Sequence, residues 1–183
     1  MGAELWVHEA PWYPEPVAAL RALQVQCLAE KYDLSHLLPQ ELHCARETVA
    51  ATEAEGDPYD LLDQYRRKVA MLEEFCSRPL PQAPEQQIEI LRKVCADSGQ
   101  GIGNVLDVKG VGEQRGVHTA ERLTEKEMVR LIGTDRPTLA QAREGVYRIH
   151  EELGRGESVC FPYYDDSDRG RAVGWYFVGN TID

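Results

Sequence analysis

The feature that most constrains the fold is a pair of β-rich runs near the end of the chain. Residues 159–164 and 172–178 are rich in aromatic and β-branched side chains, and a polar segment separates them. This composition and spacing predict two antiparallel strands joined by a hairpin turn. Because most of the preceding chain has helical spacing, we expect this hairpin to cover a helical core.

The rings of these two runs predict two chemically different faces. Side chains alternate between the faces of a strand, so Tyr163 and Trp175 each point opposite to their neighbours Tyr164 and Tyr176. We expect one face to pack on helices. The other face either packs in the core or lines a cleft, because Trp and Tyr rings are good anchors for partners and ligands.

Residues 1–97 predict a helical body. Apolar residues recur at helical spacing in four segments, which are about residues 16–32, 39–55, 58–76 and 85–96. Asp57 followed by Pro58 predicts the start of the third helix, and residues 34–38 are expected to connect the first two. Short breaks between helices favour antiparallel, bundle-like packing. Residues 1–14 are expected to form an extended arm, of which 5–7 can pair as an edge strand.

Residues 98–183 predict a smaller α+β part. Thr124 and Glu127 form a capping box that begins a helix, and Thr134 or Asp135 can cap the next one. Residues 104–108 predict a short strand. We therefore expect one compact domain over residues 1–183, of the α+β class and mainly α. It would combine a helical bundle-like body at 1–97 with an α+β part that ends in a C-terminal antiparallel β-hairpin.

The charge of the chain limits its partners. The net charge is -11, and the first 97 residues carry seventeen acidic and nine basic side chains. Binding nucleic acid requires clustered Lys and Arg, which this chain lacks, so we expect no nucleic-acid partner. A basic protein partner fits this charge, and so does a role of the acidic surface in solubility alone.

The composition favours a cytoplasmic protein without a membrane segment. No Lys or Arg precedes Arg21, and no apolar run approaches the roughly 18 residues that a membrane span needs. The five cysteines are odd in number and form no CxxC pair. They are expected to be buried thiols in a reducing compartment, and a catalytic thiol is the alternative.

A glycine-rich segment at residues 98–118 is the most suggestive candidate site. The glycines at 99, 101 and 103 have GxGxG spacing and follow a helix, so they do not match a dinucleotide-binding fingerprint. Glycines let backbone N–H groups approach an anion, and Asn104, Asp107 and His118 add polar side chains. The segment therefore predicts either a plain connecting loop or a ligand-contacting loop.

No motif identifies catalytic residues, a metal or a cofactor. The fragment with Asp166, Asp168 and Gly170 resembles part of a calcium loop, but the position of its closing acid is Phe177. The five histidines form no HxxxH pair, and no GxSxG elbow is present. We expect no bound metal and no cofactor, and whether the chain is an enzyme stays open.

Two functional hypotheses follow. The first is a protein-interaction or inhibitor-type module that binds a basic partner, with a homo-oligomer also open. The second is a small-molecule-binding protein or enzyme, with its site between the loop at 98–107 and the C-terminal aromatic strands. The candidate ligand-binding residues of that site are Gly99, Gly101, Gly103, Asn104, Asp107, His118, Tyr163, Tyr164, Trp175 and Tyr176.

Overall fold

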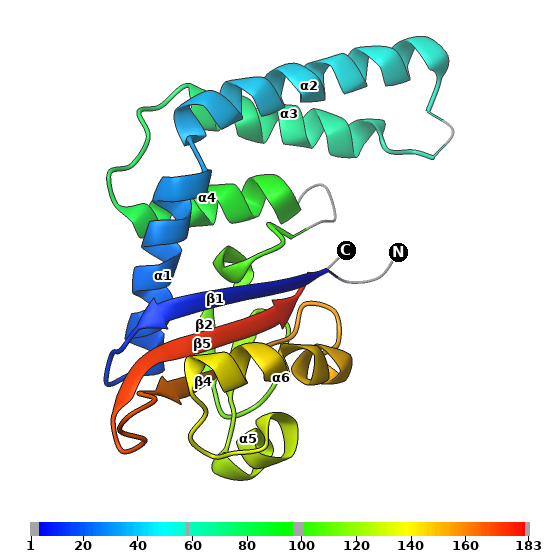
Figure 1. Ribbon diagram of the computed structural model, residues 1–183. Coiled ribbons are helices and arrows are strands. Elements are labelled where there is room, and N and C mark those ends of the chain that lie inside the picture. Colours follow the sequence, from blue (N-terminus) through cyan, green and yellow to red (C-terminus); the bar gives the residue numbers. More distant parts are fainter. Residues whose placement is uncertain (1–3, 58, 97–100, 182–183) are drawn as a thin grey trace. The chain divides into compact units, whose positions relative to one another are not determined.

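The computed structural model describes residues 4–57, 59–96 and 101–181, and these residues form α-helices and one five-stranded sheet (Figure 1). The strands are β1 (Leu5–Pro11), β2 (Gly110–Gly112), β3 (Thr119–Arg122), β4 (Ser158–Tyr164) and β5 (Ala172–Asn180). The helices are α1 (Pro16–Lys31), α2 (Leu34–Glu55), α3 (Leu62–Cys76), α4 (Pro84–Ala96), the 3-10 turn η1 (Val105–Asp107), α5 (Glu125–Ile132) and α6 (Leu139–Glu152). The predicted α+β class, mainly α, is confirmed.

The chain divides into two compact units. Unit 1 combines Met1–Cys27 with Gly99–Asp183 and contains the whole sheet, while unit 2 is Leu28–Ser98 and contains α2, α3 and α4. Helix α1 begins in unit 1 and ends in unit 2. The expectation of a single compact domain stays a prediction.

The C-terminal hairpin is part of a mixed sheet, which corrects the prediction of a simple antiparallel hairpin. The strand order is β1-β5-β4-β3-β2. Strands β4 and β5 do pair antiparallel, but β1 pairs antiparallel with the other edge of β5, and β3 pairs parallel with β4. The expected edge strand at residues 5–7 is confirmed and extends to Pro11, whose missing N–H suits an edge.

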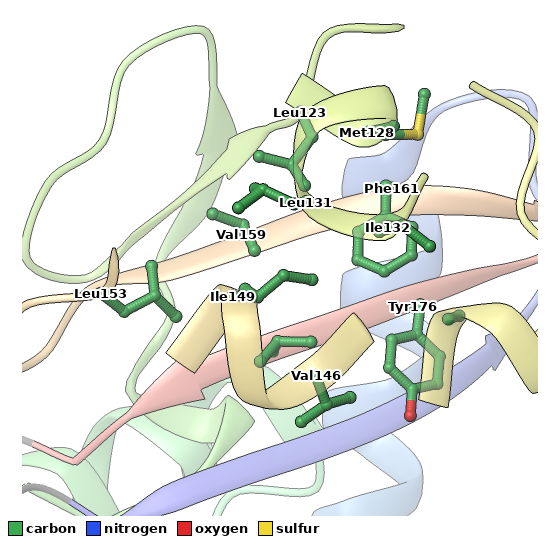
Figure 2. Close-up of a cluster of buried hydrophobic side chains, with 12 residues drawn as sticks. Leu123, Met128, Leu131, Ile132, Val146, Ile149, Leu153, Val159, Phe161 and Tyr176 are labelled. Carbon is green, nitrogen blue, oxygen red and sulfur yellow. The ribbon is translucent and has the colours of Figure 1, made fainter. Parts of the chain in front are cut away.

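Helices α5 and α6 cover one face of the sheet and form a large hydrophobic core with it (Figures 1 and 2). The core side chains are Leu123, Met128, Leu131, Ile132, Ala142, Val146, Ile149, Leu153, Val159, Phe161, Tyr176 and Val178. Burial of one such large side chain contributes about 1.5–3 kcal/mol. This cluster therefore accounts for much of the stability of unit 1.

The first turns of α1 and the turn η1 lie on the opposite face of the sheet (Figure 1). Gln24 of α1 is buried, and its Nε2 donates to the carbonyl oxygens of Val105 (3.0 Å) and Val108 (2.6 Å). Since both faces are covered, Trp175 and Phe177 on this side are fully buried. Of the two alternatives for the second face of the strands, core packing or a cleft, this part of β5 therefore shows core packing.

Local capping decides where the helices of unit 1 begin. The capping box of Thr124 and Glu127 is present, as predicted, and Gly133 ends α5 in the left-handed conformation. Helix α6, however, is capped by Thr138 rather than by Thr134 or Asp135. Thr138 forms a second capping box with Gln141, which the sequence reading overlooked.

In unit 2, helix α2 begins earlier than its sequence suggests. Residues 34–38 are helical instead of a connector, because the Asp33 carboxylate accepts a hydrogen bond from the Ser35 N–H (3.0 Å) and Pro39 is accommodated inside the helix. This bonding to Ser35 also lowers the pKa of Asp33. Over the described residues, no helix has the length and apolar character needed to cross a bilayer.

The cysteines are only partly buried, which corrects the expectation that all are core residues. Cys27 and Cys160 are buried, but Cys44 and Cys76 are exposed on α2 and α3. Burial raises the pKa of the Cys160 thiol to about 12. That thiol is therefore neutral at physiological pH.

Candidate functional site

The described part of the glycine-rich loop binds a carboxylate of its own chain. Asp107 accepts hydrogen bonds from the backbone N–H groups of Ile102 (2.9 Å) and Gly103 (2.8 Å), one on each carboxylate oxygen. Gly103 has a φ of +76°, which suits a glycine. The amides that could hold an external anion at these two positions thus hold Asp107. Gly99 lies outside the described residues, and Gly101 lies just before the amides that bind Asp107.

The remaining polar candidates of this loop are structural partners of one another. The buried Asn104 accepts from the Leu106 N–H (2.9 Å) and so caps η1, which is why residues 104–108 form a turn instead of the predicted strand. His118 Nδ1 donates to the carbonyl oxygen of Asp107 (3.0 Å). The structure therefore brings Gly103, Asn104, Asp107 and His118 together.

Two side chains pack against the ring of Trp175. It stacks on Trp12 with 5.6 Å between ring centroids, and the Arg122 guanidinium lies 5.4 Å from its centroid. Its Nε1 donates to the Tyr13 carbonyl oxygen (2.9 Å). Because Trp175 is 0% exposed, its ring is part of the core, and Trp12 is the exposed end of this stack.

Tyr176 and Tyr163 lie on the other face of the sheet, beside α6. Burial raises the pKa of both phenols, and the nearby Glu9 carboxylate raises it further. Arg143 of α6 pairs with Glu9 (2.7 Å) close to both rings. Tyr164 has a different neighbour, because the guanidinium carbon of Arg136 lies 5.9 Å from the centroid of its ring. The aromatic candidates are therefore divided between faces, and the predicted ligand pocket with the loop at 98–107 stays a prediction.

Among the residues that the structure describes, no group of three or more His, Cys, Asp or Glu side chains could hold a metal ion. The expectations of no metal and no cofactor stay predictions.

Unit 2 has a groove between α2 and α3. Two adjoining pockets of about 410 and about 340 Å³ share Thr48, Leu61 and Tyr65, so they form one continuous groove. The residues that line this α2–α3 groove are Glu41, Cys44, Ala45, Thr48, Ala51, Thr52, Glu55, Gly56, Asp57, Tyr59, Leu61, Gln64, Tyr65 and Lys68. Helices α2 and α3 lie side by side and contact each other along the hairpin (Figure 1).

Helical spacing explains why one groove can run along both helices. The lining positions on α2 are 41, 44, 45, 48, 51, 52 and 55, and those before and along α3 are 61, 64, 65 and 68. Steps of three and four residues keep side chains on one face of a helix. The middle of the α2 side is built of small side chains, and Leu61 and Tyr65 form the opposite wall.

The two ends of the groove differ in charge. At one end Lys68 Nζ pairs with Glu41 Oε2 (3.1 Å), so the cation among the lining residues is neutralised. At the other end lie Glu55 and Asp57. Asp57 accepts from the N–H groups of Leu61 (2.9 Å) and Leu62 (2.8 Å), and these bonds lower the pKa of its carboxyl. Asp57 therefore stays ionised and holds the backbone at the start of α3. The helix has Leu61 as its N-cap residue and begins at Leu62, which corrects the prediction that it starts directly after Asp57.

The opposite side of the hairpin holds paired cations. A smaller pocket of about 140 Å³ lies there among Arg46, Val49, Arg66 and Val69. Arg46 pairs with Glu73 (2.6 Å), and Arg66 pairs with Glu53 (2.8 Å). These ion-paired arginines thus line a different pocket from Glu55 and Asp57, which lie at the acidic end of the α2–α3 groove.

Sequence reasoning missed the groove residues, although a signal was present. In the segment predicted as helical at residues 39–55, positions 42, 45, 49 and 52 lie on one stripe, which is typical of an amphipathic helix with one core face. The small and exposed residues Cys44, Thr48 and Ala51 repeat beside that stripe. Only three residues of α2 are buried, namely Leu34, Leu38 and Ala45, so most of this long helix faces solvent.

Comparison of the chain with known protein families, with curated proteins and with solved structures finds no match.

Proposed function

We propose that this chain is a protein-interaction module that binds a basic protein partner through the α2–α3 groove. The observation that carries the proposal is the combination of an open, partly apolar groove with an acidic end, where the described lining residues include Glu55 and Asp57 but no Lys or Arg. Leu61 and Tyr65 offer apolar contact area, and Tyr59 beside the acidic end is 81% exposed. Apolar anchors with a charged rim are typical of protein interfaces.

The charge of the hairpin decides which partner fits. Residues 34–76 carry nine acidic and four basic side chains, a net charge of -5. Complementary charge speeds association and disfavours wrong partners. A second copy of the hairpin would bring two like charges of this size together, so a basic partner is favoured over self-association. Nucleic acid and acidic membrane surfaces are disfavoured for the same reason.

The thiols support a cytoplasmic location for this module. All five cysteines are thiols, and two of them are exposed on the hairpin. Exposed thiols persist most readily in a reducing compartment. We therefore propose that this interaction takes place in the cytoplasm.

Two natural thiols allow a direct test of where the partner binds. Cys44 lines the groove, whereas Cys76 is exposed on α3 away from the lining residues. A photo-crosslinker attached to Cys44 in a Cys76→Ser variant should capture a basic protein in an extract of the source cell. The same label on Cys76 in a Cys44→Ser variant is the matched control and should capture much less of that protein.

Charge reversal adds a second measurement with the partner so identified. Glu55→Lys should weaken its binding, and Glu151→Lys on the exposed surface of α6 should leave it unchanged. If the captured protein is not basic, or if both charge variants bind equally well, the proposal is wrong.

A further inference from the structure

We propose that the partner segment bound in the α2–α3 groove is a basic amphipathic α-helix, which packs on the hairpin as a third helix. This inference rests on the proposed function and adds the conformation of the bound segment. Helix-in-groove docking is one of the recurring modes by which proteins recognise peptides.

The shape of the groove fits a helix. Its α2 wall extends from Glu41 to Glu55, which is about 21 Å at the rise of an α-helix. This length accommodates about four turns of a bound helix. The facing wall is helix α3 at Gln64, Tyr65 and Lys68, and toward Glu55 it is the segment that precedes α3. The groove therefore follows the axis of α2. A third helix buries its apolar stripe in such a groove as helices do in bundles.

The lining residues determine what the bound helix must supply. Cys44, Thr48 and Ala51 on α2 are small and exposed, so bulky side chains of a partner can approach the α2 backbone closely. Leu61 and Tyr65 on the facing side are only half-buried and can gain burial on binding. We therefore expect large apolar residues at positions i, i+3, i+4 and i+7 of the partner.

The charges of the groove assign an orientation to the bound helix. The Glu41 end is closed by the ion pair with Lys68 (3.1 Å), while Glu55 and Asp57 lie at the other end. Lysine or arginine side chains of the partner should therefore cluster at the Glu55 end. Tyr59, which is 81% exposed there, offers a ring face for a cation.

The test uses three synthetic peptides of about 18 residues, a length of five helical turns. The first carries Leu at i, i+3, i+4 and i+7 and Lys toward one end. The second has the same composition with Leu at every other position, and the third is the first peptide with Glu in place of Lys. Binding of each to the full chain is measured by fluorescence anisotropy at about 50 and about 200 mM salt.

We expect the first peptide to bind at least about tenfold more tightly than the second and the third. Ala51→Leu in the protein, which fills the groove, should weaken its binding by about tenfold or more. Ala50→Leu is the matched control, because Ala50 is exposed on α2 but does not line the groove. Amide shifts in the NMR spectrum should change along residues 44–55 and 61–68, which keeps the proposal testable if Ala51→Leu disturbs folding.

The outcomes separate this inference from the proposed function. If the two basic peptides bind equally and Glu55→Lys weakens both, a basic partner is supported but the helical conformation is wrong. If neither basic peptide binds more tightly than the acidic one, both proposals are wrong. Helicity gained by the first peptide on binding, measured by circular dichroism, supports the inference directly.

Discussion

Two glycines of β5 lie where the sheet has no room for a side chain. A Cβ added at Gly179 would overlap the Trp6 ring, and one at Gly174 would overlap the Tyr163 ring. Both rings lie on a neighbouring strand and pack across the glycine, since Trp6 pairs with Gly179 and Tyr163 pairs with Gly174. These glycines thus decide where the two rings lie.

We expect Gly179→Ala to lower the free energy of unfolding by about 1–3 kcal/mol, because the buried Trp6 ring must move. Urea denaturation followed by tryptophan fluorescence measures this change. Gly110→Ala in β2 is the control, since a Cβ there meets no atom within 4 Å. Equal stability of the two variants would contradict the assigned packing of Trp6.

Cys160 makes the stability depend on alkaline pH. Its pKa is raised by burial from 9.0 to about 12, so the unfolded chain loses this proton first as the pH rises. Unfolding is then favoured, and stability falls by about 1.4 kcal/mol per pH unit between pH 9 and pH 12. The phenols of Tyr163 and Tyr176, whose pKa values are also raised, add to the fall above pH 10.

Chemical denaturation between pH 8 and pH 11 tests this dependence. We expect Cys160→Ala to flatten the curve between pH 9 and pH 10, whereas the exposed Cys76→Ala should leave it unchanged. A wild-type curve that is flat up to pH 10 would show that Cys160 is not buried in the folded protein.

At the scale of the element, one threonine decides where α6 begins. Thr138 Oγ1 accepts from the Gln141 N–H (3.4 Å), and Gln141 Oε1 accepts from the Thr138 N–H (3.1 Å). Loss of an N-cap costs about 1 kcal/mol, so Thr138→Ala should lower the midpoint of urea unfolding measurably. Thr134→Ala, which removes a threonine outside the helix, should change stability by less than about 0.5 kcal/mol. A larger loss of stability in Thr134→Ala than in Thr138→Ala would mean that α6 begins near Thr134.

Local chemistry explains how much of each element the sequence predicts. Thr124 and Glu127 predict the start of α5 because a capping box is a short-range signal. Pro39 misleads, because Asp33 begins α2 one turn and a half earlier and the helix tolerates the proline. Strand β2 is only three residues long and contains two glycines, so no alternation marks it.

The candidate site is harder to predict from the sequence than the fold, because it depends on contacts between distant segments. The sequence points to glycines, acids and aromatic rings, but their partners come from distant segments, such as Gln24 for the turn η1 and Trp12 for Trp175. A groove, by contrast, depends on how the surfaces of two helices lie beside each other. Ala51 and Thr48 look like ordinary helix-surface residues until α3 is placed beside them.

At the scale of the whole molecule, the sheet depends on its last two strands. β5 lies between β1 and β4, and their side chains fill the core against α5 and α6. A chain that ends at Gly156 would lose both central strands. We expect it to lack a cooperative thermal transition in unit 1, because several large side chains at about 1.5–3 kcal/mol each exceed the usual total stability of 5–15 kcal/mol.

Differential scanning calorimetry and near-UV circular dichroism check this expectation. A chain that ends at Thr181 keeps every strand and is the control. Persistence of the near-UV signal in the shorter chain would show that the helices of unit 1 pack without the sheet.

The pairing of β1 with β5 also determines when β1 can join the sheet during translation. Of the five described strands β1 is synthesised first, and β5, with which it pairs, is synthesised last. Until translation has passed Asn180, the apolar Trp6 and Val7 of the nascent strand have no sheet to join. Contacts this distant in sequence form slowly. β1 therefore stays unpaired between its own synthesis and that of β5, and this interval is when chaperones would bind it.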